Sequence, residues 1–134
     1  MVAVYGRWPV FGELPGSIGL IRRGDQFLLQ WRSDGLGWGF PGGTARWKES
    51  PERTLRREIR EETGLRVISC RSLFTFVDRT YLPVRTSVFA VEAEGEPRSS
   101  WEGSVAWRSI PSEPFFASHR PILAYLQTHS LPLG

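Results

Sequence analysis

Residues 43–65 read GTARWKESPERTLRREIREETGL, and this stretch carries the strongest local signals in the chain. Ser50 is a candidate helix N-cap, Pro51 suits the first helical position, and Gly64 suits the position just past the last turn. The sequence therefore predicts a helix over Pro51–Thr63.

Three carboxylates share one side of this predicted helix, because Glu58, Glu61 and Glu62 are spaced i, i+3 and i+4. Like charges at this spacing cost roughly 0.2–0.5 kcal/mol per pair, and the helix dipole disfavours anions near the C-terminal end. A divalent cation would reverse both penalties, since hard cations such as Mg²⁺ bind oxygen ligands and often bridge to phosphates. The alternative is a solvated charged helix, in which such runs are common.

A longer pattern favours the cation site. The stretch fits G-x5-E-x7-R-E-U-x-E-E-x-G-U without a gap, where U is a bulky apolar residue. The matching positions are Gly43, Glu49, Arg57, Glu58, Ile59, Glu61, Glu62, Gly64 and Leu65. This pattern resembles the signature of the Nudix hydrolase family, and the preceding segment 38–42 (WGFPG) resembles its usual lead-in.

The rest of the chain fits one such domain over residues 1–134, with the Nudix box at 43–65. A length of 134 residues suits a single core, and 40% hydrophobic with 23% charged residues is ordinary for a globular protein. Branched and aromatic residues between turn signals predict strands at Ser17–Arg22, Gln26–Arg32, Val67–Val77, Val84–Glu92 and Val105–Arg108. A second helix is expected at His119–Gln127, with Ser118 as its N-cap. These elements indicate a mixed sheet with a helix on each face, and the resemblance implies the same α/β/α sandwich.

Composition also bounds the compartment and the partners. No apolar run is long enough to span a membrane, and the N-terminus lacks a signal-peptide pattern. A single cysteine, Cys70, fits a reducing compartment, so we expect a cytoplasmic protein without a membrane partner. The net charge of +3 is too mild to indicate a nucleic-acid surface by itself.

The resemblance implies a set of metal ligands and a general base. The family's pattern places Mg²⁺ or Mn²⁺ on the carbonyl of Gly42 and on the carboxylates of Glu58, Glu61 and Glu62. The general base is a glutamate of the box, Glu58 or Glu61, or one from a later loop. Glu102 is the later candidate for both base and metal ligand, and the alternative is that it is a solvated loop residue.

Two further box positions have supporting roles. Arg57 either orients a catalytic carboxylate or contacts phosphate, and the alternative is a plain helix ion pair with Glu61. Glu49 is expected to brace the entry from loop to helix, and the alternative is that it binds metal through water. Gly64 is expected to be structural.

Four residues are candidates for binding substrate. Gly43 lets the backbone approach the phosphates. Arg46 and Lys48 stand where many members carry Glu and Gly, and they either contact substrate phosphates or are solvated. Tyr81 follows the box at a distance at which a tyrosine occurs in members acting on diadenosine polyphosphates.

Similarity to the family implies metal-dependent hydrolysis of a nucleoside diphosphate linked to another group. The substrate would be a small nucleotide: a (d)NTP or oxidised (d)NTP, a dinucleoside polyphosphate, ADP-ribose or a nucleotide sugar. Two alternatives stay open, an RNA 5′-pyrophosphohydrolase and a non-catalytic nucleotide-binding Nudix domain. The arginines are scattered, which does not favour nucleic acid as the partner. Homodimers are frequent in the family, although nothing in this sequence marks an interface.

Overall fold

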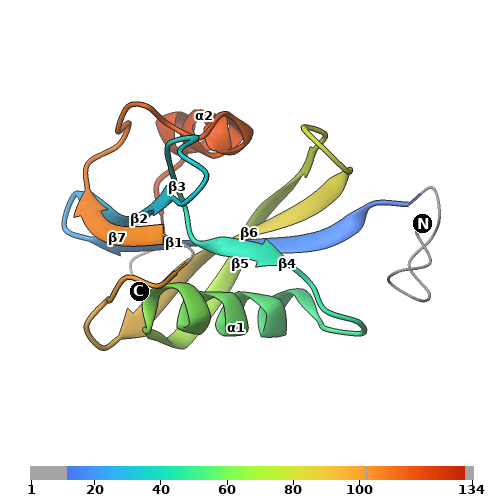
Figure 1. Cartoon of the computed structure of the whole chain (residues 1–134), viewed down its shortest axis with the longest axis horizontal. Coiled ribbons are helices and arrows are strands. Elements are labelled where there is room, and N and C mark those ends of the chain that lie inside the picture. Colours follow the sequence, from blue (N-terminus) through green and yellow to red (C-terminus); the bar gives the residue numbers. More distant parts are fainter. Residues whose placement is uncertain (1–11, 102, 132–134) are drawn as a thin grey trace.

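The computed structural model describes residues 12–101 and 103–131, which form a mixed sheet with a helix on each face (Figure 1). In chain order the elements are β1 Leu14–Arg23, β2 Gln26–Arg32, β3 Trp38–Gly39, β4 Gly42–Thr44, α1 Pro51–Thr63, β5 Arg66–Asp78, β6 Val84–Glu94, β7 Gly103–Arg108, a 3-10 turn Ala117–His119 and α2 Arg120–Thr128. The main strand order is β3-β2-β1-β6-β5, with β4 paired to β1 and β7 paired to β2. Among the described strands β1 and β6 run parallel, and the other pairs are antiparallel.

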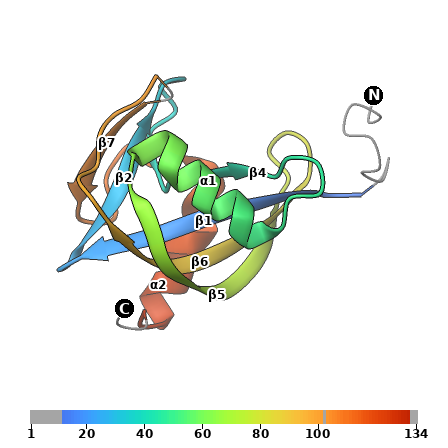
Figure 2. The ribbon, with the colours of Figure 1, turned by 90° about the horizontal axis from the view of Figure 1, so that it is seen from below.

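The two helices cover opposite faces of the sheet, with α1 in front and α2 behind in the view of Figure 2. Leu55 and Ile59 of α1 are fully buried. Their side chains occupy the space above Gly19, where an added Cβ would lie 2.9 Å from Cδ1 of Ile59. On the other face Ile122 of α2 is equally buried, in a separate cluster with Leu20. The expected α/β/α sandwich with a mixed sheet is therefore confirmed.

The local signals of α1 act as the sequence predicts. The Ser50 hydroxyl accepts a hydrogen bond from the Arg53 amide at 3.2 Å, and Pro51 occupies the first turn. Gly64 ends the helix in the left-handed conformation at φ 78°, and its amide donates to the carbonyl of Arg60. The helix therefore has the predicted bounds.

The five predicted strands are confirmed with small extensions, while the two shortest strands were not predicted. β3 and β4 span only two and three residues and are held by pairing with distant strands. The second helix begins one residue later than expected, and Ser118 is not its N-cap. A 3-10 turn precedes the helix, and the Ser118 hydroxyl lies 2.8 Å from that of Thr80 instead.

None of the helices in the described ranges is long and apolar enough to cross a membrane.

Candidate active site

Strand β4 and helix α1 bring two glutamates against two glycines. β4 pairs with the middle of β1, so the Gly42–Gly43 backbone passes over α1. The Gly42 amide donates to Glu62 Oε1 at 2.8 Å. A Cβ at Gly43 would collide with the carboxylate of Glu58, so a larger residue there would displace that carboxylate. Glu58 and Glu62 are 9% and 5% exposed, which makes them buried carboxylates at the strand–helix junction.

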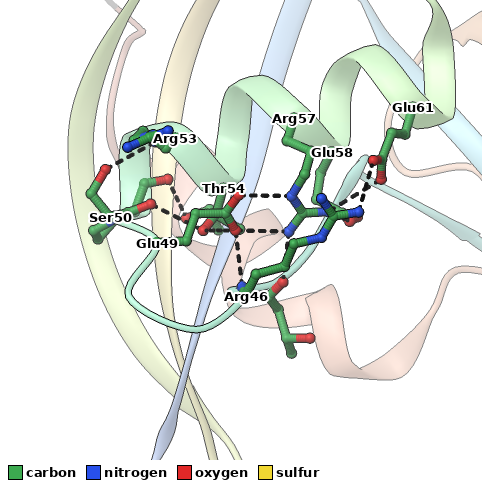
Figure 3. Close-up of polar contacts among 11 residues, drawn as sticks. Arg46, Glu49, Ser50, Arg53, Thr54, Arg57, Glu58 and Glu61 are labelled. Carbon is green, nitrogen blue, oxygen red and sulfur yellow. Dashed lines mark hydrogen bonds and ion pairs between the residues drawn. The ribbon is translucent and has the colours of Figure 1, made fainter. Parts of the chain in front are cut away.

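Arg57 joins Glu58 to the rest of the box (Figure 3). Its guanidinium forms a two-pronged pair with Glu49, Nε to Oε2 and Nη2 to Oε1, both at 2.8 Å. Nη1 donates to Oε1 of Glu58 at 2.8 Å and to Oε1 of Glu61 at 3.1 Å, and Nη2 also donates to the carbonyl of Thr44. The sequence left open an orienting role, a contact with phosphate and a plain pair with Glu61. In the structure the guanidinium contacts three carboxylates.

Glu49 is the most strongly held of these carboxylates. It accepts hydrogen bonds from the Arg46 amide at 2.9 Å and the Thr54 hydroxyl at 2.8 Å, besides those from Arg57. The Arg57 hydrogen bonds are the main cause that lowers the pKa of Glu49 to about 2. The same pairing raises the pKa of Arg57 above its ordinary value, chiefly through Glu49. These contacts tie the loop before α1 to the first two turns of the helix.

The outer rim of the site is more exposed. Glu61 keeps 42% of its side chain accessible and lies 3.3 Å from Nη2 of Arg46. Lys48 has φ 62°, a left-handed conformation that costs energy for a residue with a side chain. Its Nζ lies 5.9 Å from the ring centroid of Trp47. The rim therefore carries two basic residues. Arg46 is paired with Glu61, and Lys48 has a strained backbone conformation.

One predicted site residue within the described ranges is not brought into this cluster. Tyr81 lies in the turn between β5 and β6, 75% exposed, with no hydrogen bond or ring contact to any described residue. Glu102 lies outside the described residues. Gly64 serves as the helix C-cap.

The donor chemistry of the box fits a hard divalent cation, since carboxylate oxygens are the ligands that such ions prefer. Among the described residues, however, no three His, Cys, Asp or Glu side chains gather closely enough to hold a metal ion. The carboxylates are instead bound to Arg57, Arg46 and the Gly42 amide. Cation binding at this site therefore requires some of these contacts to be exchanged.

His119 borders the site and carries no signal in the sequence. Its Nδ1 accepts the Phe40 amide hydrogen at 3.0 Å, and its ring lies against the rings of Phe40 and Phe116. Burial of the ring, reinforced by the positive charge of Arg32, lowers the pKa of His119 to about 3. The imidazole is therefore neutral near pH 7, and it links the turn before α2 to the segment leading into β4.

Comparison with known proteins agrees with this fold and box. The family model of the NUDIX domain matches residues 14–126. The chain belongs to this family.

Three relatives illustrate the similarity. A solved structure described as a putative nudix hydrolase family member from Chromobacterium violaceum is 29% identical, with a TM-score of 0.73 over 92% of this chain and 84% of that one. A MutT NUDIX hydrolase from Burkholderia pseudomallei is 26% identical, with a TM-score of 0.73 over 88% and 99% of the two chains. An 8-oxo-dGTP diphosphatase from Proteus vulgaris is 47% identical over 38 residues, which is 28% of this chain and 34% of that protein. The match thus spans about a third of this last relative's length.

Proposed function

We propose that the chain is a divalent-metal-dependent pyrophosphohydrolase that cleaves a diphosphate linkage in a small nucleotide. The observation that carries the proposal is the burial of Glu58 and Glu62 against the Gly42–Gly43 backbone. Burying two carboxylates side by side is costly unless cations or donors compensate them. Membership of the NUDIX family supports hydrolysis of a diphosphate as the reaction that these carboxylates serve.

The residues of the box divide the work. Glu58, Glu62 and the Gly42 carbonyl would hold Mg²⁺ or Mn²⁺, with Glu61 as a further ligand. When bound, such a cation neutralises phosphate oxygens and lowers the pKa of a coordinated water. Arg57 keeps Glu58 and Glu61 in a fixed orientation, because its other contacts anchor it to the loop.

The substrate's phosphates would lie on the loop side of this cluster. Without a side chain at Gly43 the Glu58 carboxylate packs against the backbone, and the exposed Arg46 and Lys48 supply positive charge at the rim. Glu61 is the box glutamate with the best access to water, which makes it the first general-base candidate for testing. Glu58 and Glu102 are the competing candidates, and Tyr81 would contact the far end of a long substrate.

We infer that an oxidised purine deoxynucleoside triphosphate is the first substrate to test. The supporting observation is the short, 47% identical match to an 8-oxo-dGTP diphosphatase. Dinucleoside polyphosphates, ADP-ribose and nucleotide sugars are the other members of the proposed class.

The test is phosphate or pyrophosphate release from a panel of these nucleotides and 5′-triphosphorylated RNA, with Mg²⁺, Mn²⁺ or EDTA present. The proposal expects turnover of one small-nucleotide class, abolished by EDTA. Turnover of RNA alone would replace the small-nucleotide proposal with the RNA 5′-pyrophosphohydrolase. No turnover together with no metal binding would indicate a non-catalytic nucleotide-binding domain.

A further inference from the structure

Gln30, in the middle of β2, carries a buried amide that the protein leaves without a partner. The residue is 8% exposed, and its Nε2 is the single buried side-chain nitrogen or oxygen of the described residues that has no hydrogen bond. Leaving a buried donor unpaired destabilises the folded protein. Native proteins retain few such groups, so a group of this kind calls for a specific partner that completes it.

The neighbours of Gln30 place its side chain next to β3, the strand that precedes the glycines of the candidate active site. In the sheet register Gln30 lies opposite Gly39 of β3, and opposed residues of antiparallel strands share a face. A Cβ at Gly39 would lie 3.0 Å from Nδ1 of His119 and 3.5 Å from Cβ of Phe116. Gly42 lies three positions after Gly39, and its amide donates a hydrogen bond to Glu62. The amide therefore lies on the side of β2 that is continuous with the β3–β4 connection.

The side chains that lie near Gly39, the residue opposite Gln30, are aromatic and close to neutral. Arg32, the next residue along β2 on this face, lies over the ring of Phe116 at 3.7 Å and is paired with Asp34 by three hydrogen bonds. His119 accepts the Phe40 amide hydrogen and is uncharged near pH 7. Phosphate recognition uses free cationic donors, whereas aromatic rings with a neutral donor suit the face and edge of a nucleobase.

We propose that Nε2 of Gln30 donates a hydrogen bond to an acceptor on the nucleobase of the substrate, a carbonyl oxygen or an unprotonated ring nitrogen. Gln30 would then be a residue that determines base specificity, separate from the phosphate and metal sites. This inference rests on the proposed function in one respect, that the substrate is a nucleotide.

The experiment compares wild type with Gln30→Met, which keeps the length of the side chain and removes the donor. Two ligands are titrated with Mg²⁺ present. One is an analogue of GTP with methylene groups at both bridging positions, which resists hydrolysis at either anhydride, and the other is inorganic tripolyphosphate, which has no base. The melting temperature of the unliganded protein is measured alongside. Gln26→Met, at the hairpin end of the same strand, is the matched control for the chemical change.

Gln30→Met should melt at or above the wild-type temperature, because it removes an unpaired buried donor. Its affinity for the GTP analogue should fall roughly three- to tenfold, the range for one net hydrogen bond, with tripolyphosphate affinity unchanged. Gln26→Met should change neither affinity.

Three results would overturn the proposal: unchanged affinity for the GTP analogue, an equal loss for both ligands, or a lower melting temperature, which would mean that the amide serves the protein itself. Wild-type protein that binds the GTP analogue no better than tripolyphosphate would overturn it as well. The panel of nucleotides tests hydrolysis independently. If the protein bound the GTP analogue through Gln30 but hydrolysed no nucleotide of the panel, the role of Gln30 would be supported and the proposed hydrolase activity would be contradicted.

Discussion

Arg57 connects more of the site than any other single side chain. One guanidinium contacts Glu49, Glu58 and Glu61 and thereby joins the loop before α1 to two turns of the helix. Helical spacing alone predicts only the pair with Glu61, whereas the orienting role was inferred from the family resemblance. The contact with Glu49 depends on how the loop returns to the helix, which periodicity does not specify.

Replacing Arg57 with Lys should damage both stability and turnover. A lysine keeps the charge but has one nitrogen, so it cannot reproduce the two-pronged pair and hold Glu58 and Glu61 as well. We expect a loss of about 1–3 kcal/mol in the free energy of unfolding, because partly buried carboxylates lose donors. Urea unfolding and turnover of the best substrate measure the two effects, with the exposed Arg53→Lys on the same helix as control. Equal behaviour of the two variants would show that the fork of Arg57 has no special role.

His119 should make folding sensitive to mild acid. Its ordinary pKa of 6.5 falls to about 3 in the folded protein. Between these values the unfolded chain binds a proton that the folded protein does not, so stability falls as the pH drops from 6.5 towards 3 and is unaffected above 6.5. The His119→Gln variant can still accept the Phe40 hydrogen bond but has no imidazole to protonate. Between about pH 7 and about pH 5 its free energy of unfolding should therefore fall by about 1–2 kcal/mol less than that of wild type. Urea unfolding at both pH values measures this change. If the free energy of unfolding fell equally in the two proteins, the lowered pKa of His119 would be contradicted.

At the scale of elements, the long periodic segments were predictable and the short connecting strands were not. α1 and β2 have the predicted bounds because their caps, turns and apolar patterns are local. β4 forms because Gly42 and Gly43 pair with Ile18 and Ser17 of β1, far away in sequence. This unpredicted pairing brings the glycines onto the buried glutamates. The site residues were thus predictable as a motif, while their contacts were not.

The loop that joins β4 to α1 contains Lys48, whose backbone conformation is strained. Two substitutions at this residue distinguish the effect of the strain on stability from the effect of the charge on substrate binding. Lys48→Gly should stabilise the fold by roughly 1 kcal/mol, because glycine adopts a left-handed conformation without the steric cost. Lys48→Ala removes the same charge but keeps the strain, so its stability should match wild type. If Lys48 contacts substrate phosphate, both variants should raise KM to a similar degree. If KM were unchanged in both variants, Lys48 would be a solvated residue that does not contact the substrate.

At the scale of the whole molecule, a net charge of +3 with dispersed arginines favours a small anionic substrate over a nucleic-acid strand. Binding to a strand releases many counterions, so its affinity falls steeply with salt, while a small nucleotide gives a shallow dependence. We expect KM for the best nucleotide to change less than about tenfold between 50 and 200 mM salt, compared with the 10³–10⁵-fold loss typical of a protein with many phosphate contacts. A steep dependence would favour the RNA alternative.

The buried carboxylates are the centre of the proposed function, and Glu62 tests them most directly. Glu62→Gln keeps an oxygen that can accept the Gly42 amide hydrogen but removes the negative charge. Mn²⁺ binding, melting temperature and turnover should be measured together, with Glu52→Gln, an exposed change on the same helix, as control. We expect Glu62→Gln to melt like wild type yet lose Mn²⁺ affinity and turnover by on the order of 100-fold or more, since a metal site contributes several kcal/mol to such reactions. Wild-type Mn²⁺ affinity and turnover in Glu62→Gln would contradict the metal assignment on which the account depends.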